Sequence, residues 1–327
     1  MDIAILGTVM HDEITTLSGE RRSSFGGILY NLAALCVITR PTDRIRPFCQ
    51  MSKEHFAELD ARFFSRQPRI DTRHVVQHPD GTDTNRIVYR TASSRQEDLS
   101  IVTKPFDRAT LQGALDAQAL LINIVGGHEF DLETLQWLRT NYNGLVYLDV
   151  HNLGKRNPDG SPASTFAGWP DWASEVDFIQ FNEWEAQLLF GKFPEDEDDY
   201  RRILRTMMKV PTLRGAVLTL GEGGARVAHR TDGDGALYLH VPAMMMDPVV
   251  DTTGCGDCFS SGFLVGYLRG GNPVRAALLA ATISSLNTRL FGLDELLALR
   301  DVEGSLVRSY AGLLNRMDAE WKGEPLD

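Results

Sequence analysis

The hydrophobic positions of the chain fall into short continuous runs separated by helical patterns. Runs that are apolar on both faces predict buried strands at residues 2–7, 119–125, 145–150, 178–181 and 216–220. Between them, apolar residues recur every three to four positions, as in 131–141 and 196–210. Strands that alternate with helices in this way predict an α/β fold in which helices flank a central, mostly parallel sheet.

The last third of the chain has an almost wholly helical pattern. Helices are expected at residues 257–269, 273–289, 295–299 and 302–321, and Pro273 suits the first position of the second one. A tight hairpin is expected between Val217 and Val227, across a glycine-rich turn.

One stretch departs from the alternation of strands and helices. Residues 74–103 alternate apolar and polar positions with turn residues between them, which predicts a half-exposed antiparallel ribbon. Residues 15–24 offer partners for it. We therefore expect a small antiparallel β-lid, formed approximately by segments 13–24 and 74–103, inserted in a single domain that spans residues 1–327.

Composition and charge exclude several classes of partner. The formal net charge of -11 disfavours a nucleic-acid surface, because the phosphates would meet no broad positive area. No apolar run approaches the ~18 residues that a membrane helix needs, and the first run begins at Asp2 without a basic flank, unlike a secretion signal. Four cysteines (Cys36, Cys49, Cys255 and Cys258) in a chain of 327 residues fit reduced thiols better than a disulfide framework, so we expect a cytoplasmic protein.

The stretch DTTGCGDCFSSGF, residues 251–263, allows several kinds of site. Cys255 and Cys258 have the spacing of a zinc ligand pair, but no second close pair accompanies them. A dinucleotide fingerprint would need a small residue where Phe259 stands, and no Gly-Lys pair in the chain is followed by the Ser or Thr of a Walker A motif. An anion-binding turn at a helix start fits the stretch best.

Gly254 and Gly256 permit the backbone angles of such a turn, and a helix is expected to begin directly after them. The first N–H groups of a helix lack internal partners and carry the positive end of its dipole, which suits a phosphoryl group in transfer. Asp257 lies at the same helix start. Its carboxylate would either stabilise the helix by ~1 kcal/mol as a cap or act as a general base, and these residues alone leave both roles open.

Five short motifs follow one another along the chain. They are Gly7 to Asp12, Gly26-Gly27 with Asn31, Asn182 to Glu185, Thr219 to Gly224, and Asp251 to Asp257. In this order they resemble the motifs of the ribokinase-like (PfkB) family of carbohydrate and nucleoside kinases. The resemblance covers nearly the whole chain and implies an ATP-dependent kinase with Mg²⁺, acting on a hydroxyl group of a sugar or sugar-like acceptor.

The resemblance also implies a role for each motif residue. Asp257 would be the general base, and the amides of Gly254, Cys255 and Gly256 would form the anion hole. Residues expected to bind the acceptor are Asp12, Gly26, Gly27 and Asn31. Residues expected to bind the nucleotide are Asn182, Thr219, Gly221 and Gly224. Glu185 would hold Mg²⁺ through water, and Asp251 with Thr253 would border a monovalent-cation site for K⁺.

The chain departs from the family pattern at two positions. Cys255 stands where the family usually has Ala, but the backbone makes the contact there, so we expect activity to survive. His151 takes the Asn position after the strand at 145–150, which bears on acceptor identity, as does His128 in a nearby loop. Arginines that offer a phosphate contact within the lid are Arg86, Arg90 and Arg95.

Two other functions stay open on the sequence. A nucleoside kinase of the same fold would need aromatic stacking on the acceptor side, for which Phe25, Phe130 and Trp169 are candidates. A protein that binds a sugar or nucleotide without catalysis would have no use for Asp257 as a base. The outer face of the lid is a candidate surface for a homodimer.

Overall fold

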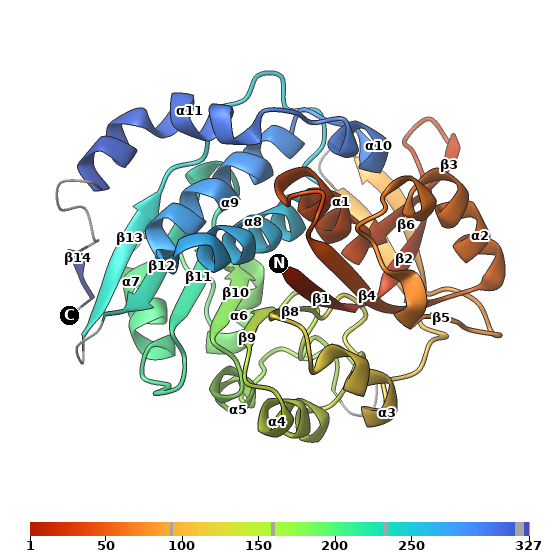
Figure 1. Ribbon diagram of the computed structural model, residues 1–327, viewed down its shortest axis with the longest axis horizontal. Helices are drawn as coiled ribbons and strands as arrows, with labels where there is room; N and C mark the ends of the chain where they lie inside the picture. The colour runs from red at the N-terminus through yellow and green to blue at the C-terminus, as the bar shows by residue number, and fades with distance from the viewer. Residues whose placement is uncertain (92–93, 158–160, 232–234, 318–323, 327) are drawn as a thin grey trace.

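The computed structural model describes residues 1–91, 94–157, 161–231, 235–317 and 324–326 (Figure 1). Within these residues a ten-stranded sheet has the order β14-β13-β12-β11-β10-β9-β8-β1-β4-β5. The pairs from β11 to β5 are parallel, and those from β11 to β14 are antiparallel. The strands are β1 (Asp2–Gly7), β4 (Arg44–Met51), β5 (Val75–Gln77), β8 (Ala119–Asn123), β9 (Leu145–Asp149), β10 (Phe178–Asn182), β11 (Gly215–Thr219), β12 (Ala225–Arg230), β13 (Ala236–Val241) and β14 (Glu324–Pro325). The predicted α/β class with a mostly parallel sheet is confirmed.

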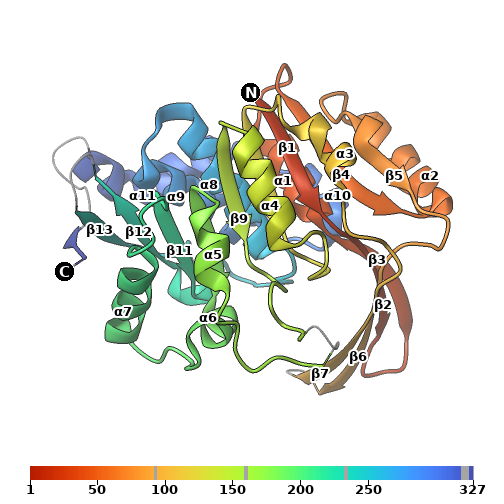
Figure 2. The ribbon, with the colours of Figure 1, turned by 90° about the horizontal axis from the view of Figure 1, so that it is seen from below.

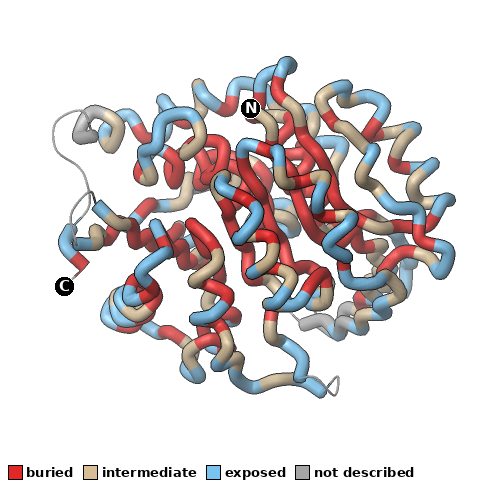
Figure 3. Tube along the Cα trace, turned by 60° about the horizontal axis from the view of Figure 1, so that its bottom comes forward, coloured by how far each residue is buried: buried red, intermediate tan, exposed pale blue. Residues whose placement is uncertain are grey.

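Helices cover both faces of this sheet because its strands are apolar on both sides. Ile3 and Ile5 of β1 belong to one core, and Ala4 and Leu6 belong to the other. Figure 3 shows the strands of the sheet largely buried, with exposed residues on the outer helices, whereas α1 is buried over nearly its whole length. The first core is covered by α1 (Ile28–Ile38), α8 (Cys255–Gly270), α9 (Pro273–Asn287), α10 (Gly292–Leu297) and α11 (Val302–Met317). The second is covered by α3 (Arg108–Leu111), α4 (Leu132–Asn141), α5 (Trp169–Ser174), α6 (Glu183–Phe190) and α7 (Glu197–Met207).

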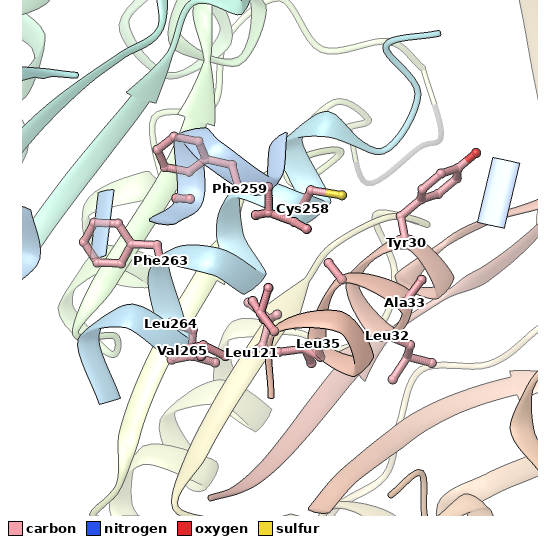
Figure 4. Packing of buried hydrophobic residues seen from close by; sticks show 14 of the residues in the cluster. Tyr30, Leu32, Ala33, Leu35, Leu121, Cys258, Phe259, Phe263, Leu264 and Val265 are labelled. Carbon is pink, nitrogen blue, oxygen red and sulfur yellow. The ribbon is translucent and has the colours of Figure 1, made fainter. Parts of the chain in front are cut away.

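Close packing fixes the position of α8, the helix that begins at the glycine-rich turn. Carbon atoms added at Gly262 and Gly266 would lie 2.6 and 2.7 Å from the Cα atoms of Ala280 and Ala276 in α9, so glycine lets the two helices touch. On another side, apolar residues of α8 lie in the same buried cluster as those of α1 and β8 (Figure 4). The start of α8 is therefore held rigidly against the sheet.

A second, four-stranded sheet forms the lid (Figure 2), in the order β3-β2-β6-β7. Its strands are β2 (Val9–Thr15), β3 (Arg21–Gly27), β6 (Thr84–Thr91) and β7 (Ser94–Ser100), and α2 (Lys53–Arg62) lies near its base. The pairs β2–β3 and β6–β7 are antiparallel, as expected, whereas β2–β6 is parallel. The two central strands run the same way because each of them enters the lid from the main sheet.

Two boundaries of the predicted lid segments differ in the structure. Val75–Gln77 pairs with β4 and belongs to the main sheet, so the second segment enters the lid only at Thr84. The first segment enters it at Val9, which places Asp12 inside a lid strand and not at the end of a main-sheet strand. None of the helices in the described ranges is both long and apolar enough to cross a membrane.

Candidate active site

Asp257 lies in the first turn of α8, and its side chain is buried, with 8% of its surface exposed. Asn123, the last residue of β8, donates a hydrogen bond of 2.6 Å from Nδ2 to Oδ1 of Asp257. Burial raises the pKa of Asp257 to about 6, and the Asn123 amide opposes this rise. The carboxylate is therefore held inward with a pKa suited to accept a proton near neutral pH.

Asn31 of α1 is fully buried beside this pair. Its Nδ2 donates to the carbonyl oxygen of Asp257 at 2.9 Å and to Oγ of Ser260 at 3.0 Å, while its Oδ1 accepts from Asn123 at 2.9 Å. The direct acceptor contact expected of Asn31 stays a prediction. Here Asn31 ties α1 to the start of α8 and so positions the base.

The predicted anion hole surrounds the first residues of α8. Gly254 has φ of 75°, and a side chain there would collide with the ring of Tyr30, so only glycine fits. The first intrahelical bond of α8 runs from Cys258 N to Gly254 O, at 2.9 Å, which leaves the Gly256 amide ahead of the hydrogen-bond ladder. A Cβ at Gly256 would make only an ordinary contact, with Nε2 of Gln180 at 3.8 Å, and Gly256 lines a cavity.

Two polar residues that were not among the predicted site residues lie beside Asp257. Gln180 of β10 donates from Nε2 to Asp149 Oδ2 at 2.9 Å and to the carbonyl oxygen of Gly256 at 3.0 Å. Asp149 is buried at the end of β9, and its pKa lies well above its ordinary value because of burial and the charges of Glu185 and Asp257. Polar residues at the carboxyl ends of apolar strands are the signal that would have found Asn123 and Asp149, whereas Gln180 is a polar residue in the middle of β10.

Glu185 and Asn182 form a capping box at the start of α6. Asn182 Oδ1 accepts from the Glu185 amide at 3.0 Å, and Glu185 Oε2 accepts from the Asn182 amide at 2.9 Å. Burial raises the pKa of Glu185 to about 7, against the opposing effects of Lys155 and Asn182.

The buried carboxyl groups around Glu185 fit a divalent cation. The charges of Glu185 and Asp257 raise the pKa of Asp149, and the charge of Asp257 also raises the pKa of Glu185. A nearby cation would relieve this repulsion. The described residues contain no group of three His, Cys, Asp or Glu side chains placed to coordinate a metal directly. Mg²⁺ held through water by Glu185 stays a prediction.

A cavity of about 490 Å³ opens beside the start of α8. Cys255 and Gly256 line it, together with all the residues that were expected to bind the nucleotide, which are Asn182, Thr219, Gly221 and Gly224. Its apolar wall is formed by Met244, Met245, Met246, Val249, Phe259 and Ala281. The fold thus brings three motifs, from α6, the β11–β12 hairpin and α8, to one cavity.

The hairpin expected between Val217 and Val227 is present, and it forms one wall of this cavity. Thr219 at the end of β11 pairs with Ala225 of β12, and a short 3₁₀ turn at Gly221–Gly223 joins the strands. Gly224 has φ of 77°, and a side chain there would collide with the carbonyl oxygen of Val241 in β13. Glycine at position 224 lets the turn between β11 and β12 lie against Val241 of β13.

Asp12 and Gly26 lie next to each other on the lid. A Cβ at Gly26 would lie 2.8 Å from Oδ2 of Asp12, so the absence of a side chain makes room for this carboxylate. The pKa of Tyr30 is raised by burial first, and then by the charges of Asp251, Asp257 and Asp12. Asp12 and Asp257 therefore approach the same tyrosine from the lid and from α8, which places the lid acid near the base. Gly27 caps α1 with φ of 65°.

Asp251 and Thr253 form a closed turn before α8. The amide and the hydroxyl of Thr253 donate to Asp251 Oδ1 at 2.9 and 2.8 Å, and Asn287 of α9 donates to the Thr253 carbonyl oxygen at 2.8 Å. These bonds order the loop that leads into the anion hole. The monovalent-cation site at these residues stays a prediction.

The remaining candidates from the sequence lie around the acceptor side. His151 adopts φ of 42° after β9, and burial lowers its pKa to about 4, so it is neutral. His128 Nε2 lies 3.0 Å from Oγ1 of Thr103, at the base of the lid. Arg86 pairs with Glu13 at 3.4 Å, and Arg90 donates to Gln96 at 2.7 Å, while the side chain of Arg95 lies outside the described part of the chain.

Solved structures of ribokinase-type enzymes superpose on most of the chain. A pyrophosphate-dependent kinase in the ribokinase family matches with a TM-score of 0.73 and 18% identity, over 91% of this chain and 100% of that one. Arabidopsis thaliana ribokinase, solved with ribose and ATP, matches with a TM-score of 0.70 and 15% identity, over 91% and 99% of the two chains. At these identities the likeness establishes the fold, which is ribokinase-like.

A family model described as pfkB family carbohydrate kinase matches residues 61–297, so the chain belongs to the pfkB family of carbohydrate kinases. Its sequence is similar to an ATP-dependent 6-phosphofructokinase of Thermoanaerobacterium thermosaccharolyticum, with 33% identity over 119 residues that cover 36% of this chain and 33% of that protein. It is also similar to a cytidine kinase of Thermococcus kodakarensis, with 38% identity over 99 residues, or 30% and 31% of the two chains. The matched segments thus span about a third of the length of these curated relatives.

Proposed function

We propose that the protein is an ATP-dependent kinase that transfers the γ-phosphoryl group to a hydroxyl of a sugar or sugar-like acceptor. The observation that carries this proposal is the position of Asp257. Its buried carboxylate, with a pKa of about 6, lies one residue after Gly256, which lines the cavity of about 490 Å³. A base and a set of helix-start amides are thereby adjacent at one point, which in-line phosphoryl transfer requires.

In the proposed reaction, the acceptor oxygen attacks the γ-phosphorus while the bond to the β-phosphate oxygen breaks. The proton of the acceptor hydroxyl passes to the carboxylate of Asp257, and ADP leaves. The amides of Gly254, Cys255 and Gly256, at the positive end of the α8 dipole, stabilise the charge on the transferred group. Mg²⁺, held near Glu185 through water, would neutralise charge on the donor phosphates. The lid excludes water, so that ATP hydrolysis does not compete.

The donor cavity supports ATP over inorganic pyrophosphate. Its wall of Met244, Met245, Met246 and Phe259 is apolar and suits a purine base, whereas pyrophosphate has no group to fill that space. A structural neighbour depends on pyrophosphate, so the choice of donor needs a direct test.

The aromatic residues that would favour a nucleoside acceptor are occupied elsewhere. Phe25 packs against His11 and His55, with ring centroids 5.1 and 5.0 Å apart. Phe130 packs on Trp172 and Trp169 on Phe190, and the three candidates Phe25, Phe130 and Trp169 are themselves buried. A sugar-like acceptor is therefore the better proposal, although relatives include a cytidine kinase.

The experiment that tests the proposal measures ADP release with ATP, Mg²⁺ and a panel of sugars, cyclic polyols and nucleosides. Acceptor-dependent release with a sugar or polyol is expected, and release with nucleosides alone would favour the nucleoside kinase. Binding without release by any acceptor would favour a catalytically silent sensor. Replacing ATP by pyrophosphate, with phosphate release as the readout, tests the donor. A homodimer through the outer lid face stays a separate prediction, checked by light scattering.

A further inference from the structure

A hydrogen-bond acceptor without a partner lies in the lid. Oδ1 of Asn85, on β6, is buried and has no hydrogen-bond partner among the described residues. Leaving a buried carbonyl unsatisfied costs free energy, so such a group in a folded protein calls for a ligand or another explanation. Asn85 is paired in register with Asp12 on β2, and residues paired in this way project from the same face of a sheet.

This shared face of the lid looks toward the proposed site. The carboxylate of Asp12 lies over Gly26, just before α1, and the ring of Tyr30 in the first turn of α1 packs against Gly254 of the predicted anion hole. The charges of Asp257 and Asp12 both raise the pKa of Tyr30, in keeping with this placement. The opposite face carries His11, whose ring lies 4.6 Å from that of His55 in α2, between centroids. Arg86, the residue after Asn85, also belongs to the opposite face, where it pairs with Glu13.

The chemistry of the Asp12–Asn85 pair defines the group that it can bind. A carboxylate and an amide carbonyl oxygen both accept hydrogen bonds, so their ligand must donate at least two. Neighbouring hydroxyl groups of a sugar or cyclic polyol do this. A phosphate ester or a carboxylate offers only acceptor atoms at neutral pH and would be repelled by the charge of Asp12.

We propose that Asn85 binds a hydroxyl group of the acceptor beside Asp12, and that the end of the acceptor under β2 and β6 is a neutral diol and not a phosphate ester. This inference rests on the proposed kinase function. It separates the protein from kinases whose acceptor already carries a phosphate, such as the 6-phosphofructokinase that it resembles over part of its length.

The lid arginines bear on the same question. Arg86 projects from the outer face, and Arg90 is exposed and bonded to Gln96. Arg95 pairs with Tyr89 on β6, four residues beyond Asn85 toward the end of the lid, and its side chain lies outside the described residues. Arg95 is therefore the lid arginine whose replacement belongs in the test.

The test uses the full chain with ATP and matched acceptors: ribose and ribose 5-phosphate, fructose and fructose 6-phosphate, and myo-inositol and myo-inositol 1-phosphate. Initial rates of ADP release give KM and kcat for each. The expected result is that the free member of a pair is the better substrate. Asn85→Leu should raise the acceptor KM about 3- to 10-fold, the value of one hydrogen bond, and leave the KM for ATP unchanged. Arg86→Gln, on the outer face of the same strand, is the matched control and should change neither.

Asn85→Ser, which keeps a hydrogen-bond acceptor without adding a charge opposite Asp12, guards against misfolding of the Leu variant and should also raise the acceptor KM, and thermal unfolding of both variants is compared with the wild type. The inference would be overturned if the wild type preferred a phosphorylated acceptor and Arg95→Gln lost this preference. It would also be overturned if the acceptor KM of a well-folded Asn85→Leu protein were unchanged. Both results would leave the kinase function standing. No ADP release with any acceptor, free or phosphorylated, would instead remove the proposed function, and the inference with it.

Discussion

The side-chain amide of Asn123 donates a hydrogen bond of 2.6 Å to the carboxylate of Asp257. This bond favours the charged form of the base and opposes burial, which raises the pKa of Asp257 to about 6. A strand end and a helix start, 134 positions apart in the chain, thus set the protonation of one carboxyl group.

Replacing Asn123 by Ala should therefore move the acidic limb of the pH–rate profile. Without the amide, the pKa of Asp257 rises further. Because the base must be deprotonated, kcat should begin to fall at a higher pH than in the wild type as the solution is made more acidic. Initial rates between about pH 5 and pH 9 measure the limb. Asn141→Ala, which removes an exposed asparagine bonded to the Trp137 carbonyl at the end of α4, is the control. An acidic limb that stays in place in Asn123→Ala would show that the bond does not tune the base.

Asp257 should also make the protein less stable at higher pH. Its folded pKa of about 6 lies above the ordinary value of 3.8, so the folded state holds the proton more tightly than the unfolded state. The unfavourable contribution grows as pH rises through this window and is complete above it. Asp257→Asn should consequently raise the free energy of unfolding by ~3 kcal/mol at about pH 8 and by little at about pH 4. Urea unfolding at the two pH values measures this, and an equal effect at both would contradict it.

Glu185→Gln should raise the Mg²⁺ concentration needed for half-maximal rate. Glutamine keeps one oxygen for the capping box with Asn182 but removes the charge that a hydrated cation would sense. Rates across a Mg²⁺ titration test this. Glu183→Gln, in the same helical turn and near Tyr200, is the matched control. If Glu185→Gln shows the same Mg²⁺ dependence as Glu183→Gln and the wild type, Glu185 does not hold Mg²⁺.

Cys255→Ala should retain turnover within about threefold, because the thiol makes only weak contacts with Ser284 and Asn287 at 3.5 Å and the backbone lines the anion hole. An alkylating reagent should nevertheless inhibit the wild type, since Cys255 lines the donor cavity while Cys258 is fully buried. ATP should protect against the reagent, and the Ala variant should resist it. Inhibition of Cys255→Ala at the wild-type rate would place the reactive thiol elsewhere.

Much of the fold followed from hydrophobic pattern alone, because buried parallel strands such as β1 and β8 are continuously apolar. β4 was missed because Arg44 and Arg46 interrupt its run, although Arg46 is 2% exposed and pairs with Asp2 at 2.8 Å. No local pattern reveals that a distant acid will neutralise a buried arginine. β5 was assigned to the lid because alternation identifies a strand but not the sheet that it joins.

The residues of the candidate site were predictable where they lie close together in one sequence motif. Gly254, Gly256 and Asp257 are such a case, and the cavity beside them could be expected from the glycine pattern. Asn123 and Gln180 were not predicted, because each is a single polar residue in an apolar strand, Asn123 at the end of β8 and Gln180 in the middle of β10. Their importance comes from the parallel sheet, which brings strand ends together. Asn31 was predicted from its motif as an acceptor residue, but its hydrogen bond to the carbonyl oxygen of Asp257 joins residues 226 positions apart, and no local pattern shows such a contact.

Catalysis in the proposed reaction depends most on Asp257 as the proton acceptor beside the helix-start amides, and one measurement tests this role directly. It compares acceptor-dependent ADP release by the wild type and by Asp257→Asn at about pH 7.5, with ATP affinity measured by calorimetry on the same preparations. The predicted result is a loss of turnover of ~10²-fold or more with ATP binding nearly unchanged. Turnover at the wild-type rate in a folded Asp257→Asn protein would contradict the proposed mechanism.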